Sequence, residues 1–471
     1  MVVGRLLGLT VAAVVVLTIW VQLAAFTQER VSQTEVKFFQ EQTRELYLPG
    51  VESREEWTAG RSLVEAENWD RENGRCGDEA ETCTLTLRFP PQPIWDSELV
   101  INGTRGVLDI EQPMTGEIDA GFKCLLADVV LQEDHWITSV EPLIDTFPDP
   151  NRPGSRYDVV HHMDLFFCEP GVRTTRRYNL DDSFTCSHDS FIQNSLPLNV
   201  EGRLKKFLEM AIKELHPACF FGLVYDRGGE SLSLGQDLGF LIGPSTSGSR
   251  EIVVQSHYLA PKHYRERYTP VWDNSAFKIT LRRVKREGRE EKRDPIGLLA
   301  INDYGLKYPK GRVIQHSYAV PSSDLGEALT GDFADFGNEI QPVAVHLHGH
   351  FLTKSIWVDH MRGGKKVGEY GRKDEYRADG PDQSFFFLPQ GDQERPLLRG
   401  DHLRVNCLVD TRPAENDVLY GVSHDTEMCA AIFIYKNHNP LSPLNYPKSN
   451  ILSLCTDLRL CLGGYPKGQE E

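Results

Sequence analysis

Apolar and polar residues alternate along much of this chain in short runs that have the period of a β-strand. The first clear run is 84–89, where leucines and a phenylalanine alternate with threonines and an arginine. Because successive side chains of a strand point to opposite faces, this pattern predicts a strand with one buried face. Similar apolar runs follow at 99–101, 124–130, 136–144, 158–167, 251–258, 277–281, 343–350, 403–409 and 429–435.

Turn-forming residues separate these runs and indicate the fold class. The segment 148–154, for example, contains three prolines and a glycine. Many short strands with frequent turns are typical of β-sandwiches and jelly rolls. One segment departs from the pattern, because apolar residues between Leu204 and Leu215 recur at helical spacing and predict an amphipathic helix in an inserted loop. We therefore predict an all-β protein with one short helical insertion.

The N-terminal segment is almost continuously apolar from Leu6 to Phe26 and follows Arg5. Its length is near the minimum for crossing a bilayer. Two interpretations stay open, a signal peptide cleaved near Ala24 and Ala25 or an uncleaved signal anchor, and the length of the apolar run favours the anchor. Either segment would direct the rest of the chain to the secretory pathway, as a single-pass membrane protein with a lumenal or extracellular catalytic part or as a secreted protein.

Cysteine content and charge narrow the compartment and the partners. Ten cysteines in an oxidising compartment predict disulfides, and the sequon Asn102-Gly103-Thr104 predicts glycosylation at Asn102. The formal net charge of −17 argues against nucleic acid as a partner, because phosphate binding needs a basic surface. The basic stretch 282–293 is interleaved with glutamates, and we interpret it as a solvated loop.

Candidate chemistry comes from three clusters of metal-ligand side chains. Imidazole binds both Cu(I) and Cu(II), and a thioether favours Cu(I), so five histidines with one methionine suit copper. Zinc sites rarely recruit methionine, and calcium and magnesium prefer oxygen. For each cluster, the alternative is a set of ordinary structural histidines. The six candidates are His161, His162, His257, His346, His348 and Met428.

The histidines of the clusters differ in whether a regular strand would place them on one face. His346, His348 and His350 occupy alternate positions of one run and can share a strand face. His161 and His162 are adjacent, so both can reach one metal only where the strand twists locally or ends.

The strings around these residues appear in the order HHMDLFFC at 161–168, HY at 257–258, HLH at 346–348 and EMC at 427–429. Together they resemble the copper type II, ascorbate-dependent monooxygenases, a family that includes peptidylglycine alpha-hydroxylating monooxygenase and dopamine beta-monooxygenase. The resemblance covers roughly residues 85–436, most of the chain. It implies two successive antiparallel jelly-roll domains, each with one copper. The resulting segments are an anchor or signal peptide at 1–27, a stem at 28–83, domains at 84–266 and 267–436, and a tail at 437–471.

The resemblance also implies residue roles. It assigns His346, His348 and Met428 to a copper site beside the substrate, and His161, His162 and His257 to an electron-transfer copper site. His350 falls outside the matched pattern, and Gln255 matches a glutamine of some relatives. The implied disulfides are Cys124–Cys186, Cys168–Cys219 and Cys407–Cys429. Cys76, Cys83, Cys455 and Cys461 have no counterpart, and their closeness in sequence suggests Cys76–Cys83 and Cys455–Cys461.

Three departures from the family bear on the substrate. Peptide-amidating members hold the peptide carboxylate with an arginine and a tyrosine, where this chain has Ala344 and Ile432, and a further tyrosine is replaced by Phe122. The bidentate cation that suits a carboxylate is therefore missing.

The tripeptide Arg399-Gly400-Asp401 spells an integrin motif, but it matches a family turn and we interpret it as a turn.

The expected activity is insertion of one oxygen atom from O2 into a C–H bond of a small organic substrate. Two copper ions per chain and ascorbate as reductant are implied by the resemblance, and the departures favour a dopamine beta-monooxygenase-like substrate over a peptide. One alternative is a non-catalytic, metal-binding jelly-roll protein of the cell surface. Another is a zinc hydrolase built on His346 and His348, which would need a carboxylate near the metal.

Overall fold

The fold is taken from a computed structural model of the 471-residue chain. It describes residues 63–77, 80–90, 92–94, 117–145, 159–168, 184–186, 219–245, 251–261, 271–286, 289–304, 307–322, 339–378, 380–393, 395–420, 426–437 and 451–455. The predicted N-terminal segment, the glycosylation site, the strand at 99–101, the amphipathic helix and Cys461 lie outside these residues. Among the described residues, no helix is both long and apolar enough to cross a membrane.

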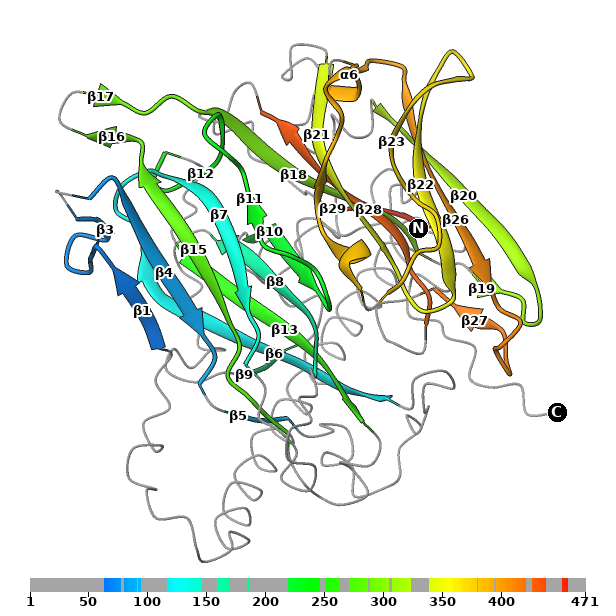
Figure 1. The fold of residues 1–471 in the computed structure, drawn as a ribbon, viewed down its shortest axis with the longest axis horizontal. Helices are drawn as coiled ribbons and strands as arrows, with labels where there is room; N and C mark the ends of the chain where they lie inside the picture. Colours follow the sequence, from blue (N-terminus) through cyan, green and yellow to red (C-terminus); the bar gives the residue numbers. More distant parts are fainter. Residues whose placement is uncertain are drawn as a thin grey trace, which may run out of the picture. The chain divides into compact units, whose positions relative to one another are not determined.

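The N-terminal half is a sandwich of two layers (Figure 1). One layer has the strand order β1 (Leu63–Glu67), β4 (Thr82–Arg88), β15 (Ala276–Arg283), β7 (His135–Leu143) and β12 (Leu238–Ile242), with β11 (Leu232–Ser233) beside β7. The other has the order β10 (Cys219–Asp226), β8 (Val160–Cys168), β13 (Glu251–Pro261), β6 (Glu117–Val130) and β9 (Phe184–Cys186).

Alternation along β4 and β15 supplies the core between these layers. Leu85, Leu87 and Ile279 are fully buried, and they belong to one apolar cluster with Leu165 and Val253 of the opposite layer. Every residue of β8 is buried, including its two histidines. The histidine strand is therefore a central element of the fold.

The C-terminal half is a second sandwich. One layer contains β18 (Asp294–Tyr304), β28 (Cys429–Lys436), β21 (Glu339–Gly349) and β24 (Phe386–Phe387), with β25 (Leu397–Leu398) beside β21 and β29 (Ile451–Cys455) beside β18. The facing layer has the order β20 (Val313–Pro321), β26 (His402–Asp410), β22 (Thr353–Arg362) and β23 (Lys365–Lys373). Leu299, Val345 and Phe433 pack from the first layer against Ile356 and Val405 of the second.

The two halves share one large sheet. β12 pairs with β18 in parallel, which joins the first layer of the N-terminal half to the first layer of the C-terminal half. This pairing and the pairing of β18 with β29 are parallel, whereas the other strand pairs in the described ranges are antiparallel. The chain is therefore all-β as predicted, although its sheets are mixed.

The layer β18–β28–β21 is covered on both faces. Leu299 and Phe433 face the C-terminal core, whereas Leu298, Ile432 and Ile434 belong to the core cluster of the N-terminal half. Because strand residues alternate, His346 and His348 share a face with Ala344, which also belongs to the N-terminal cluster. The fold therefore turns these two histidines toward the N-terminal half.

Smaller elements complete the described chain. Two-residue and three-residue strands form the pairs β2 (Trp69–Asp70) with β3 (Arg75–Cys76), β5 (Gln92–Ile94) with β14 (Val271–Asp273), β16 (Lys285–Arg286) with β17 (Arg289–Glu290), and β19 (Lys307–Tyr308) with β27 (Val418–Leu419). The helical elements in the described ranges are the 3-10 turn η4 (Pro381–Gln383) and the one-turn helix α6 (Gln390–Gln393).

The structure bears on three interpretations made from the sequence. The stretch 282–293 is not simply a solvated loop, because Arg293 is buried and its guanidinium donates to the carbonyl oxygens of Gly235 and Leu238, both at 2.9 Å. Asp401 is buried in the turn before β26, which confirms the turn interpretation of the tripeptide. Within the predicted stem, β1 pairs with β4 in the large sheet. The predicted segment boundaries stay predictions.

Candidate metal centre

The first cluster of histidines lies on two neighbouring strands of the N-terminal half. His161 and His162 come from β8, and His257 comes from β13 directly opposite His162. All three are buried, and one ligand atom of each lies within 4.8 Å of the other two. Their ring centroids are 5.0–5.4 Å apart. The structure therefore brings together the three residues predicted to hold one copper.

A β-bulge explains how adjacent histidines converge. The register pairs His257 with His162 and Tyr258 with Val160, so His161 is an extra residue without a partner position in β13. Such a bulge adds local twist and redirects a side chain. The convergence that a regular strand would forbid is thus built into β8.

Aromatic and acidic side chains surround this cluster. Phe122 of β6 stands opposite His257 and stacks on its ring, with centroids 4.0 Å apart and an interplanar angle of 6°. The carboxylate of Asp164 lies 3.4 Å from Nε2 of His162. The departure at Phe122 therefore places an apolar wall directly beside a candidate ligand.

The second cluster contains a residue that the sequence did not suggest. His346 and His348 of β21 lie beside Asp226, the last residue of β10. Oδ2 of Asp226 is 2.7 Å from Nε2 of His346 and 3.4 Å from Nδ1 of His348. All three side chains are buried, and one ligand atom of each lies within 4.8 Å of the other two. This group of three joins the two halves of the molecule.

The ionisation of Asp226 and His348 is coupled. Burial raises the pKa of Asp226, but the interactions with His348 and His346 outweigh it and hold the pKa well below its usual range. Burial lowers the pKa of His348, but Asp226 and Gln383 outweigh it and raise the pKa above its usual value. In the absence of another cation, the carboxylate and an imidazolium thus stabilise each other.

Gln383 fixes the tautomer of His348. Its amide nitrogen donates to the carbonyl oxygen of Ala378, which leaves the amide oxygen as an acceptor for Tyr376 at 2.8 Å and for His348 at 3.0 Å. Nδ1 of His348 therefore carries a proton and donates, and in the neutral ring the lone pair is on Nε2. A hydrogen bond from the second ring nitrogen is the usual way in which a metal-ligating histidine is oriented.

His350 lies between the two clusters. Its ring centroid is 5.9 Å from that of His161 and 5.4 Å from that of His348, and its Nδ1 is 2.8 Å from the carbonyl oxygen of Thr426. Burial, followed by the charge of His348, lowers its pKa to about 3, so the ring is neutral at physiological pH. Although His350 falls outside the family pattern, it is buried where the two clusters approach each other.

Met428 directly precedes β28, and its role as a ligand stays a prediction. The register sets His348 opposite Ala430, so extending it by one alternate pair places Met428 opposite His350. Its side chain is partly buried against the C-terminal core.

The buried Glu427 carboxylate accepts bonds from the amides of His350, Leu352 and Met428 at 2.6, 2.8 and 2.9 Å, and burial raises its pKa to about 7.

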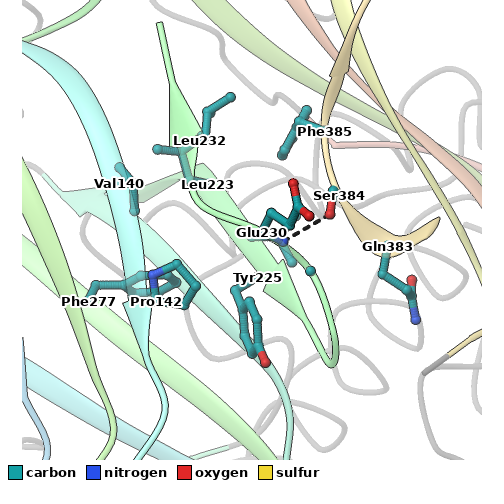
Figure 2. Close-up of a pocket in the computed structure, with 12 residues that line it drawn as sticks. Val140, Pro142, Leu223, Tyr225, Glu230, Leu232, Phe277, Gln383, Ser384 and Phe385 are labelled. Carbon is teal, nitrogen blue, oxygen red and sulfur yellow. Dashed lines mark hydrogen bonds between the residues drawn. The ribbon is translucent and has the colours of Figure 1, made fainter. Parts of the chain in front are cut away.

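A pocket adjoins the second cluster (Figure 2). Gln383, which contacts His348, forms part of its wall, as do Tyr225, which precedes Asp226, and Phe385, whose ring centroid is 5.2 Å from that of His346. The lining is mostly apolar and aromatic, with the carboxylate of Glu230 as its one acidic group. The full lining is Val140, Pro142, Leu223, Val224, Tyr225, Gly229, Glu230, Leu232, Phe277, Gln383, Ser384 and Phe385.

Disulfides secure strands close to both clusters. Cys407–Cys429 links β26 to the first residue of β28, and Cys76–Cys83 closes the segment before β4, so both predicted pairs are confirmed. Cys124 and Cys168 are also disulfide-bonded. The backbone register sets Cys168 opposite Cys219 and Phe122 opposite Cys186. The predicted pairings Cys124–Cys186 and Cys168–Cys219 stay predictions, because the side chains of Cys186 and Cys219 lie outside the described ones.

Comparison with known proteins agrees with this chemistry. Residues 333–454, which include His346, His348 and Met428, match the family described as copper type II ascorbate-dependent monooxygenase, C-terminal domain. The chain is 22% identical over 348 residues to tyramine beta-hydroxylase of Caenorhabditis briggsae, covering 71% of this chain and 48% of that protein.

Two vertebrate proteins show a similar degree of likeness. The chain is 23% identical over 342 residues to DBH-like monooxygenase protein 1 of Gallus gallus, covering 71% of this chain and 45% of that protein. It is 23% identical over 330 residues to DBH-like monooxygenase protein 1 of Mus musculus, covering 69% and 44%. The chain thus spans about half the length of the curated relatives that it matches. These similarities support a relationship to the copper type II, ascorbate-dependent monooxygenases.

Proposed function

We propose that this chain is a copper-dependent monooxygenase that hydroxylates a C–H bond of a small organic substrate with O2 and a reductant such as ascorbate. The observation that carries the proposal is the presence of two separate, buried groups of metal-ligand side chains, one on β8 and β13 and one around β21. The overall reaction takes one C–H bond, O2, two electrons and two protons to one C–OH bond and water.

The donor atoms of both groups fit copper. The first group offers three imidazoles, and the second offers two imidazoles near the position predicted for a thioether. His346 is fully buried with Nε2 2.7 Å from the carboxylate of Asp226, a close contact between a candidate ligand and a buried charge that a metal ion would stabilise. We therefore propose two copper ions per chain. When bound, they would store one electron each and supply the oxygen chemistry.

The protein side chains would orient the ligands and exclude water. Gln383 holds His348 with Nε2 available, and Asp164 lies beside His162. Phe122 and Phe385 cover one imidazole of each group, which limits access of solvent. Restricting water protects a redox reaction from unproductive side reactions.

The substrate we propose resembles phenylethylamines more than peptides. Ile432 stands opposite His346, and Ala344 precedes His346 by two residues on the same strand face. Both side chains are buried and apolar, so this surface offers no cation for a peptide carboxylate. The neighbouring pocket has a volume of only about 10 Å³, room for about one water molecule, so the aromatic side chains of Tyr225, Phe277 and Phe385 and the carboxylate of Glu230 would contact a phenylethylamine only once the pocket opens.

The proposal is tested by copper analysis and oxygen consumption on the same preparation. The copper-loaded chain should contain two equivalents of copper and should consume O2 in the presence of ascorbate and a phenylethylamine. Substitution of His161 by alanine should reduce both the copper content and the hydroxylated product. Glycine-extended peptides should be poor substrates. Two bound coppers without any hydroxylated product from either class would favour the alternative of a non-catalytic metal-binding protein.

Asp226 favours a second candidate function, a zinc hydrolase. Two histidines and one carboxylate form a common set of zinc ligands, and the sequence alone had shown no such carboxylate. Metal analysis of the protein purified without added metal separates the candidates. Zinc in the second site, with ester or amide hydrolysis that a zinc chelator abolishes, would support the hydrolase.

We also propose that residues 28–471 occupy an oxidising compartment of the secretory pathway. The disulfides Cys76–Cys83 and Cys407–Cys429 support this location, because structural disulfides persist mainly in such compartments. A signal anchor or cleaved signal peptide at residues 1–27 and glycosylation at Asn102 stay part of this proposal, and deglycosylation followed by mass measurement tests the glycosylation.

A further inference from the structure

We propose that Asp226 is a metal ligand of the second site, which adds a carboxylate from the N-terminal half to His346 and His348 of the C-terminal half. The inference deepens the proposed function, on which it rests, because it changes the donor set of the copper site beside the substrate. The predicted set contained two imidazoles and a thioether and no charged ligand.

The geometry of the carboxylate is that of a converging ligand. Oδ2 of Asp226 lies 2.7 Å from Nε2 of His346 and 3.4 Å from Nδ1 of His348, so the carboxylate contacts both imidazoles. One ligand atom of each of the three buried residues lies within 4.8 Å of the other two, which is close enough for all three to hold one ion. Nδ1 is the ring nitrogen of His348 that contacts Asp226, and it also donates to Gln383, so an ion between the three residues would take Nδ1 from Gln383 or would need the ring to turn and present Nε2.

The charge of Asp226 leads to the same conclusion. The side chain is 2% exposed, and a buried carboxylate is costly unless a cation or several donors compensate it. Within the part of the chain that the structure describes, the cationic groups within 4.0 Å of this carboxylate are the two imidazoles alone. A divalent metal bound between all three would supply the missing positive charge without protonating its own ligands.

The backbone holds Asp226 firmly in this position. Asp226 is paired with His162 across β10 and β8, and the amide of the next residue, Arg227, donates to the carbonyl oxygen of His161 at 2.8 Å. A tight turn follows, closed by the amide of Gly229 on the carbonyl oxygen of Asp226 at 2.8 Å. A Cβ at Gly229 would lie 2.8 Å from the carbonyl oxygen of Gln383, so glycine permits the two segments to touch.

This placement has a redox consequence. A carboxylate is a hard anionic ligand and stabilises Cu(II) more than Cu(I), whereas a thioether does the reverse. Asp226 should therefore increase the affinity of the second site for Cu(II) and lower its reduction potential. It also makes a metal ion a bridge between the two halves of the molecule.

The test measures metal binding and does not depend on turnover. The full chain with His257→Ala, which weakens the first site, is compared with the same chain carrying Asp226→Asn in addition. Cu(II) affinity is measured by competition with a chelator, and the reduction potential by potentiometric titration. We expect Asp226→Asn to weaken Cu(II) binding about a hundredfold. Loss of a residue that only orients a metal ligand typically weakens binding about 10- to 100-fold, so loss of a ligand itself should reach at least the upper end of that range. If Cu(I) binding is unchanged, the potential should rise by about 120 mV, since a tenfold change in a one-electron couple is about 59 mV.

Asp164→Asn is the matched control, because Asp164 is also a buried carboxylate beside a candidate histidine ligand, but at the first site. In the His257→Ala background it should leave the second site unchanged. X-ray absorption spectroscopy of copper in the His257→Ala chain identifies the ligands of the second site directly, without a substitution at Asp226. It should show two imidazoles and a short oxygen ligand.

The outcomes separate the inference from the proposed function. Equal Cu(II) affinity and potential with and without Asp226, or a copper spectrum without the oxygen ligand, would overturn the inference while leaving a copper enzyme intact. A His257→Ala chain that binds no copper at all would instead overturn the proposed second site. If Asp226→Asn fails to fold, Asp226→Glu keeps the charge, and a displaced carboxylate should still weaken Cu(II) binding.

Discussion

At the level of single residues, each histidine cluster has one buried carboxylate beside it, and the two clusters differ in how closely that carboxylate contacts a candidate ligand. The first has the stacked ring of Phe122 at 4.0 Å and one carboxylate at 3.4 Å from His162. The second has Asp226 in direct contact with His346. A site with negative charge closer to the metal binds the more highly charged oxidation state more tightly. The two proposed coppers should therefore have different potentials, with the lower potential at the site that contains Asp226.

Glu230 provides a test of the substrate proposal. Its side chain is exposed, and its amide donates to Ser384 Oγ at 2.9 Å, which sets it at the pocket wall. Glu230→Gln should raise KM for a phenylethylamine about two- to fivefold, the effect of losing an exposed ion pair. An analogue with an uncharged hydroxyl in place of the ammonium should be unaffected. Steady-state kinetics with both substrates check this, and an equal change for both would remove Glu230 from amine binding.

Residue identity alone revealed the histidines but not the whole second cluster. His346 and His348 were recognisable because strand alternation puts them on one face. Asp226 follows an apolar run and lies more than a hundred residues from His346, so no local spacing links it to them. The convergence of His161 with His162 depends on a bulge, and a bulge leaves no alternation signal in the sequence.

At the level of elements, a buried carboxylate in a turn connects two strands of the facing layer of the C-terminal half. Asp401 lies in the turn that leads into β26, where its carboxylate accepts two bonds from Arg362 at 2.7 and 2.8 Å and lies 2.7 Å from Nε2 of His360. Gly400 supplies the positive φ of 90° that this turn requires. The buried carboxylate therefore ties β22 to the turn before β26.

This network predicts a pH dependence of stability. Burial alone would raise the pKa of Asp401, but the bonds from Arg362, the Leu398 amide and His360 lower it to about 2. A carboxyl group with a lowered pKa in the folded state stabilises the protein above its unfolded pKa of about 4, and this contribution is lost as pH falls toward 2. Asp401→Asn should therefore lower the free energy of unfolding by about 2 kcal/mol at pH 7, and the difference should shrink below pH 4, as measured by urea denaturation.

Asp410 serves as the control for this prediction. Its pKa is also lowered to about 2, chiefly by the side-chain bond from Arg412, but the Arg412 side chain is 66% exposed. Solvent and salt screen such a pair, so Asp410→Asn should cost well under 1 kcal/mol and less at high salt. An equal loss of unfolding free energy for the two substitutions would show that burial of Asp401 does not increase its contribution to stability.

The disulfide Cys407–Cys429 should contribute to both stability and site geometry. It closes a sequence separation of 22 residues and fixes the first residue of β28, directly after Met428. Replacing both cysteines by serine should reduce the free energy of unfolding by about 3 kcal/mol. The disulfide Cys76–Cys83 closes a sequence separation of seven residues, and its strand β4 is far from β28 in the strand order. Its removal should therefore leave the copper affinity of the second site unchanged. Chemical denaturation with copper titration of both variants checks this pair.

Strands could be predicted from the sequence where apolar and polar residues alternate, as in β4 and β26, and where a short apolar run is bounded by turn residues, as in the fully buried β8. β4 and β26 alternate between apolar and polar residues, and the predicted runs coincide with them. β18 has a continuous apolar stretch without alternation, because one face packs on each core, and its pattern did not predict a strand. β23 is mostly exposed and charged, so it also lacks the signal.

At the level of the whole molecule, the two sandwiches have separate cores on the two faces of one shared layer. Leu298 of β18 is 2% exposed and clusters with the N-terminal half, whereas its neighbour Leu299 packs into the C-terminal half. The second cluster of ligands lies on the same joint, with Asp226 from one half and His346 from the other. The strand pattern predicted a β-sandwich or jelly roll, and the family resemblance implied two such domains. Neither could show that one layer serves both, because that depends on long-range pairing of β12 with β18.

The shared layer predicts one cooperative unfolding transition for the described part of the chain. Leu298→Asp would place a charge against the N-terminal core and should cost several kcal/mol. Because β18 belongs to both cores, amide hydrogen exchange should show an equal loss of protection in β8 and in β26. Val313→Asp is the control, since Val313 is 49% exposed and its substitution should have little effect. Loss of protection confined to β26, or two separate calorimetric transitions in the unmodified chain, would mean that each sandwich unfolds on its own. A metal ion held by Asp226 and His346 should in either case delay their separation, because it binds only while both halves are folded.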